Sequence, residues 1–170
     1  MFSSCPYLGE KIYEDIKETY RDDGHYWLQY GSFELEYGTN IDLAENFLGQ
    51  AEALMPNSVQ VVTATAHLLL KKSIAAQSEV IARGFRDEAL RILRAQFADS
   101  KQVGLHALHI FGSQQISYIK RWIEPGSRAA RFRDVHDELR RSIPVNLKSH
   151  PELTRLIADL KREELMMVIK

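Results

Sequence analysis

Two histidines, His106 and His109, have the spacing that could bind a metal ion, because residues three apart share one face of a helix. No acidic residue lies within a turn on either side of them, so further ligands are absent locally. His67 lies in the most apolar segment, which favours a hydrogen-bonded core histidine. Nothing near Cys5, the only cysteine, would lower the pKa of its thiol. We therefore expect no metal site, no cofactor and no thiol nucleophile.

The densest basic stretch covers residues 121–141, where acidic side chains are interleaved with six arginines. Interleaving of this kind disfavours a nucleic-acid groove, which needs a continuous basic surface. We expect intramolecular ion pairs or contact with a partner protein instead. The residues predicted to make that contact are Arg121, Arg128, Arg131 and Arg133.

Within this stretch, Arg131 and His136 have four residues between them, a spacing that resembles the signature of HEPN-type helical ribonucleases. The resemblance implies that the histidine is the acid/base and that the arginine holds the scissile phosphate. Phe132 departs from the polar residue usual after the arginine. With 13 Arg and 6 His, about one such spacing is expected by chance. A solvated basic face is therefore favoured, and the ribonuclease is the alternative.

Charge is distributed unevenly along the chain, although the net charge is only −1. Residues 1–56 carry 3 basic and 11 acidic side chains, a balance of −8, whereas residues 57–170 carry 19 and 12, a balance of +7. Two solvated regions of opposite charge would explain this distribution. The alternative is head-to-tail contact of the acidic end with the basic end, in a larger chain or an assembly.

The composition indicates one helical domain in these 170 residues, 45% of which are hydrophobic and 26% charged. Glycine (9) and proline (5) are scarce, which disfavours a turn-rich β-sandwich or barrel. No apolar run approaches the ~20 residues that span a bilayer, and the first residues lack the pattern of a signal peptide. We therefore expect a soluble, cytoplasmic protein that does not bind membranes.

Apolar periodicity predicts an all-α fold of about eight helices joined by short loops. A capping box at Asp42 and Glu45 predicts one helix start, and Gly38 predicts a stop in the left-handed conformation. Residues 73–86 carry no clear signal for helix or loop. The expected helices cover residues 10–23, 25–37, 42–55, 58–72, 87–97, 102–122, 128–142 and 149–168.

Residues 27–56 resemble the tetratricopeptide repeat, a pair of antiparallel helices that stacks with its neighbours. Small residues let the two helices approach, large ones fill the space beside them, and a proline ends the second helix. Glu34 departs from the pattern, which has a large aromatic residue there. The matching residues are Trp27, Gly31, Ala44, Leu48, Ala51 and Pro56.

We therefore predict a short α-solenoid in a single domain over residues 1–170. Its clearest repeat covers residues 27–56, a degenerate second unit covers 57–98, and the C-terminal helices cover 102–168.

Two segments, His25–Glu34 and Asp42–Leu48, resemble the C-terminal helical region of large bacterial P-loop NTPases. These include STAND-type proteins and relatives joined to sirtuin-like effector domains. His109–Gln114 resembles a later segment of the same region. The resemblance implies a sensor, scaffold or oligomerisation module, often in antiphage defence. The chain has no glycine-rich P-loop of its own.

These observations predict a non-enzymatic module for protein–protein contact or self-assembly. The expected partner is another protein, other domains of a larger chain, or a second copy in a homo-oligomer. Nucleic acid and membrane are not expected partners.

Overall fold

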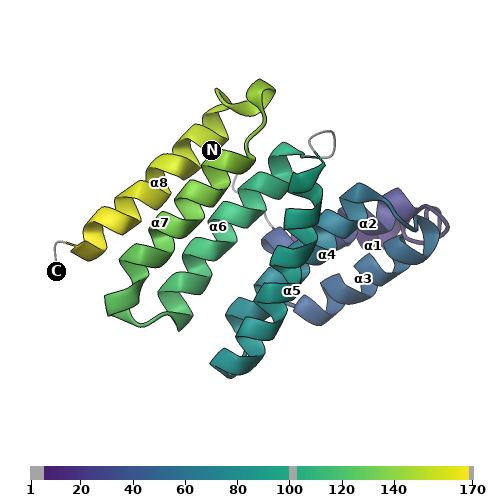
Figure 1. The fold of residues 1–170 in the computed structure, drawn as a ribbon. Helices are drawn as coiled ribbons and strands as arrows, with labels where there is room; N and C mark the ends of the chain where they lie inside the picture. The colour runs from purple at the N-terminus through teal and green to yellow at the C-terminus, as the bar shows by residue number, and fades with distance from the viewer. Residues whose placement is uncertain (1–5, 100–102, 169–170) are drawn as a thin grey trace. The chain divides into compact units, whose positions relative to one another are not determined.

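The computed structural model describes residues 6–99 and 103–168 and confirms the predicted all-α class. In these ranges the chain forms eight α-helices and one short 3-10 helix, with no strand (Figure 1). The predicted contact of antiparallel neighbours is seen, whereas the tetratricopeptide assignment stays a prediction. The elements are α1 (Pro6–Ile16), α2 (Gly24–Tyr37), α3 (Ile41–Leu54), α4 (Val59–Ala75), α5 (Glu79–Ala98), α6 (Leu105–Trp122), α7 (Pro125–Ser142), η1 (Val145–Leu147) and α8 (Pro151–Val168).

The chain divides into two compact units within α4. Unit 1 runs to Leu68 and unit 2 begins at Leu69. The sequence places a repeat boundary earlier, between residues 56 and 57, and its single-domain organisation stays a prediction.

Two predicted helix ends differ from those observed. Asn40, rather than Asp42, caps α3, because its side-chain oxygen accepts hydrogen bonds from the backbone N–H groups of Asp42 and Leu43, both at 3.1 Å. Gly38 does end α2, but at φ −77° it is not left-handed, so the predicted conformation is wrong. The carboxylate of Glu34 occupies the space that a Cβ at Gly38 would need. Glycine is therefore favoured there by packing.

The boundaries of α1 and α5 also differ from the sequence analysis. α1 ends at Ile16, and hydrogen-bonded turns follow it up to Asp23. The segment 73–86, left open by the sequence, divides between the end of α4 and the start of α5. Ser78 accepts a hydrogen bond from the N–H of Ile81 and so caps α5.

The core of unit 1 is the hairpin of α2 and α3, with the residues that the repeat pattern predicted at its centre. Gly31 lies against Leu48: a Cβ there would be 2.8 Å from the leucine's methyl carbon. Trp27 is buried beside them, and its ring centroid is 5.6 Å from that of Phe47. The side chains buried in this core are Tyr26, Trp27, Leu28, Tyr30, Leu35, Ala44, Phe47, Leu48, Ala51, Val61, Ala64 and Leu68.

α1 covers the aromatic side of this hairpin. The ring of Tyr13 stacks on that of Tyr30 at 4.6 Å, and the Tyr26 hydroxyl donates to the Tyr13 carbonyl at 2.8 Å. Burial raises the pKa of Tyr26 to about 12. Glu34, at the position where the repeat pattern has an aromatic residue, is buried nearby. Its pKa is raised by burial and by the charge of Glu10.

Unit 2 contains a bundle in which α6, α7 and α8 each pack against the other two, while α5 packs against α6 (Figure 1). Gly112 permits the close approach of α6, because a Cβ there would be 2.6 Å from a methyl carbon of Leu156 on α8 and 3.1 Å from one of Leu139 on α7. The apolar pattern of the sequence predicts an inner face of α6 made of Leu105, Leu108, Gly112, Ile116, Ile119 and Ile123. This prediction is only partly right. It missed the fully buried Phe111 and the buried Tyr118. Because α6 contacts helices on several sides, its buried surface is wider than one stripe.

α8 is tied to the bundle by a buried carboxylate, Glu164. It accepts hydrogen bonds from Lys161 and from Arg133 of α7, both at 2.7 Å. These bonds, that of Lys161 first, hold the pKa of Glu164 below its ordinary value of 4.5. Its charged form therefore stabilises the folded bundle.

We expect Glu164→Gln to lower the free energy of unfolding by about 2 kcal/mol at neutral pH. Because the folded-state pKa is lowered, this stabilisation is complete above pH 4.5 and is lost as pH falls through the folded-state value. Urea titrations at several pH values should show the difference from wild type shrinking towards acid pH. The control is Glu163→Gln. Because Glu163 pairs with the half-exposed Lys120, we expect this substitution to lower the free energy of unfolding by less than about 1 kcal/mol. A difference that does not change with pH would contradict the expectation.

Candidate functional site

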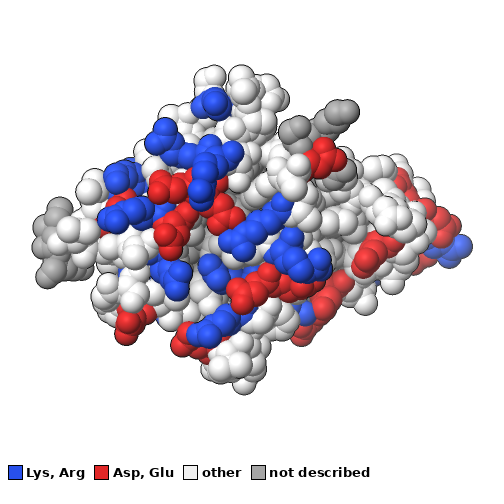
Figure 2. All heavy atoms as spheres, in the orientation of Figure 1, with Lys and Arg blue, Asp and Glu red and all other residues white. Residues whose placement is uncertain are grey.

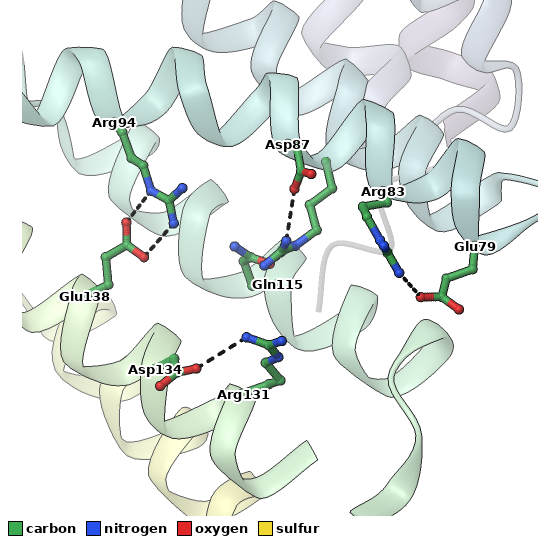
Figure 3. Close-up of polar contacts among 9 residues, drawn as sticks. Glu79, Arg83, Asp87, Arg94, Gln115, Arg131, Asp134 and Glu138 are labelled. Atoms are coloured by element: carbon green, nitrogen blue, oxygen red, sulfur yellow. Dashed lines mark hydrogen bonds and ion pairs between the residues drawn. The ribbon is translucent and has the colours of Figure 1, made fainter. Parts of the chain in front are cut away.

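A cleft of about 320 Å³ lies in unit 2, lined by side chains of α5, α6 and α7. Three arginines and two acidic residues supply its polar lining, and one tyrosine and two isoleucines complete it. Figure 3 shows Arg83 and Asp87 extending from α5, and Arg131 extending from α7 toward Gln115 of α6. The lining residues are Glu79, Arg83, Arg86, Asp87, Tyr118, Ile119, Ile123 and Arg131.

Arg86 is the least exposed of the three arginines. Its Nε donates to the Gln115 side-chain oxygen at 2.9 Å, its Nη1 donates to Asp87 at 3.2 Å, and its guanidinium lies 4.8 Å from the ring centroid of Tyr118. Burial lowers the pKa of the Arg86 guanidinium. Asp87 is its charged partner, and Gln115 and Tyr118 are uncharged. These contacts hold the guanidinium in place at the cleft.

The other two arginines are more exposed and form pairs along their own helices. Arg83 contacts Glu79 at 2.6 Å, one turn earlier on α5. Arg131 contacts Asp134 at 3.6 Å, and both side chains are more than half exposed. Pairs of this kind contribute at most about 1 kcal/mol. Both arginines can therefore exchange these partners for an incoming anion.

A bidentate ion pair holds α5 and α7 together beside the cleft. Arg94 donates two hydrogen bonds to Glu138, at 2.6 and 2.9 Å (Figure 3). This fork-to-fork geometry restrains both side chains more than a single contact would. It therefore limits how far the helices that carry Arg83 and Arg131 can separate.

The four arginines predicted to contact a partner fall into different environments. Arg131 lines the cleft. Arg133 pairs with Glu164, and Arg128 donates to the carbonyl of Ile123 at 2.7 Å, so both stabilise unit 2. Arg121 is exposed and lies 5.1 Å from the ring centroid of Trp122. The structure thus brings only one of the four into the cleft.

Arg131 and His136, the residues of the ribonuclease alternative, do not share an open face. Five residues along an α-helix correspond to about 140° around its axis. Arg131 is exposed, whereas His136 is buried and its Nδ1 lies 2.9 Å from Asp137. The ribonuclease alternative stays a prediction, without support from this geometry.

The remaining chemical candidates among the described residues, His67, His106 and His109, do not line the cleft. His106 and His109 are exposed on α6, and no group of three or more potential metal ligands occurs among residues 6–99 and 103–168. His67 is buried in α4, as the sequence suggested. Cys5 lies outside the described residues. Within the described ranges, no helix combines the length and apolar character needed to cross a membrane.

Sequence reasoning missed most of the cleft. Arg83 and Arg86 lie in the segment that carried no clear signal, and Gln115 and Tyr118 lie on a face of α6 expected to be outside the core. The four-residue spacing of Glu79 and Arg83 was the available signal, since it predicts an ion pair on a helix. It does not indicate which other helix lies opposite.

No protein-family model, no curated protein and no solved structure matches this chain.

Proposed function

We propose that this chain is a non-enzymatic interaction module that self-associates, with the acidic unit 1 of one copy contacting the basic unit 2 of the next. One observation carries this proposal: the charge division of the sequence coincides with the division of the fold. No Asp, Glu, Lys or Arg lies between residues 57 and 68, so unit 1 retains −8 and unit 2 retains +7. Opposite charges on separate units steer two copies into head-to-tail contact.

The surface of unit 2 suits a protein partner better than nucleic acid. Figure 2 shows that lysine and arginine side chains on the visible face of unit 2 are interleaved with acidic ones. A nucleic-acid backbone would meet these acidic side chains as well as the basic ones, and the acidic ones would repel its phosphates. A protein surface can match such an alternating pattern residue by residue.

A wider role as a sensor or scaffold within a bacterial defence NTPase is proposed on the sequence resemblance alone. The segments that carry it, residues 25–34 and 42–48, belong to α2 and α3 of unit 1. In such a protein, self-association of this module would bring the attached domains together.

Light scattering on a sizing column, at low and high salt, tests the self-association. The screening length falls from about 30 Å at 0.01 M salt to about 3 Å at 1 M, which weakens contacts between exposed charges. We expect a mass at low salt that is a multiple of 19.6 kDa and that approaches 19.6 kDa at high salt. A mass of one chain at both salt concentrations would overturn the proposal.

A further inference from the structure

We propose that the cleft lined by Arg83, Arg86 and Arg131 is the binding site for one carboxylate side chain of a second copy. The acidic segment 14–23, at the end of α1, supplies that carboxylate. This inference rests on the proposed self-association and names the residues through which it occurs.

The charge of the cleft favours a carboxylate as its ligand. Three arginines and two acids, Glu79 and Asp87, line the cleft, so the lining residues carry one net positive charge. Asp134, outside the lining, pairs with Arg131 and offsets that charge until an incoming acid takes its place. A single carboxylate balances that charge, whereas a phosphate group, at about −1.5 to −2, would exceed it. Guanidinium groups also match the planar carboxylate, since each can donate two parallel hydrogen bonds.

The three arginines have complementary parts in binding. Arg86 is held in place by Gln115 and the ring of Tyr118, so it needs little reordering. Arg83 on α5 and Arg131 on α7 each form an ion pair with an exposed acid, Glu79 and Asp134 respectively. Ordering two such side chains costs entropy, and the fixed position of Arg86 reduces the total cost.

The segment 14–23 offers two acids with the right exposure. The side chains of Glu18 and Asp22 are 88% and 89% exposed. Both pair with Arg21, at 4.0 and 3.7 Å respectively, so within the described residues this group of three side chains carries one net negative charge. By contrast, Glu14 accepts a hydrogen bond from Tyr30, and Asp23 caps α2. Glu18 and Asp22 are therefore the acids able to enter another copy's cleft.

Because the cleft and the acidic segment are different surfaces, the interface is heterologous. Each copy then offers one acid donor and one cleft, and contacts can continue from copy to copy. This arrangement predicts how variants behave when they are mixed. A copy whose cleft is disrupted still has an intact acidic segment, and a copy whose acidic segment is changed still has an intact cleft.

The experiment compares charge-reversal variants by light scattering at low salt. The cleft variant is Arg83→Glu/Arg131→Glu, and the acid variant is Glu18→Lys/Asp22→Lys. We expect each alone to have the mass of a single chain, with an affinity for itself lowered by about tenfold or more. Mixed in equal amounts, they should form a two-chain species and nothing larger. All four side chains are more than half exposed, and circular dichroism checks that each variant folds.

The matched control is Arg121→Glu/Arg155→Glu, which changes the charge of unit 2 equally at exposed positions outside the cleft. It should associate as wild type does. If it loses association as fully as the cleft variant, or if the mixed variants stay single chains, the cleft is not the site. In either case the proposed self-association still stands. If wild type itself is a single chain at low salt, the proposed function and this inference both fail.

Discussion

Replacing Phe111 by alanine is expected to lower the free energy of unfolding by about 3–5 kcal/mol. Phe111 has no exposed surface, and its ring meets that of Phe97 edge-on at 5.5 Å. Truncation removes the transfer free energy of the ring and leaves a cavity, because α6 is held between neighbouring helices and cannot collapse onto it. The total free energy of unfolding of a native protein is only about 5–15 kcal/mol, so unit 2 of the Phe111→Ala variant should be close to unfolding.

Urea denaturation followed by circular dichroism measures this loss. The control is Leu165→Ala in α8, where half of the side chain is exposed, with an expected change within about 0.5 kcal/mol. If Phe111→Ala costs less than about 1 kcal/mol, then the residue is not in a packed core and the arrangement of unit 2 is wrong.

Replacing Gly31 by valine is expected to cost about 3 kcal/mol, at the upper end of overpacking effects. A Cβ at this position would be 2.8 Å from two carbons of Leu48 and 3.3 Å from its backbone nitrogen. The leucine side chain can turn aside, but the backbone cannot, and valine adds two further methyl groups. The substitution should therefore separate α2 from α3 and disrupt the core of unit 1.

Gly49→Val is the matched control, since Gly49 lies in α3 and, beyond its chain neighbours and the backbone of its own helix, a Cβ added there would have no atom within 4 Å. It should be neutral or slightly stabilising, because valine has a higher helix propensity than glycine. The fluorescence of Trp27, buried in the same hairpin, follows the unfolding of unit 1 when Trp122 is replaced by phenylalanine. Equal effects of the two substitutions would contradict the close contact of α2 and α3.

The fold class and the hairpin of unit 1 could be predicted from the order of the amino acids. Periodicity and local end signals decide helices, because the interactions that form a helix lie within about four residues. The contact of Gly31 with Leu48 was predictable for a related reason. A short loop between two helices forces them to be antiparallel neighbours, and small residues mark where they approach.

The helix ends depended on competition between nearby groups. Asn40 and Asp42 are both good capping residues, and only the backbone path of the loop decides which side chain faces the exposed N–H groups. Gly38 likewise ends α2 in an extended conformation, with the carboxylate of Glu34 packed against it, which the local sequence did not indicate.

The cleft could not be predicted, because it depends on contacts between helices that are distant in the chain. Arg86 and Gln115 are 29 residues apart, and no pattern within either helix indicates that the other lies opposite. Which face of α6 meets α5 depends on packing of the whole bundle, because a helix that contacts several neighbours buries more than one stripe. The charges are thus present in the sequence, and the packing of α5, α6 and α7 selects which three of the arginines share a site.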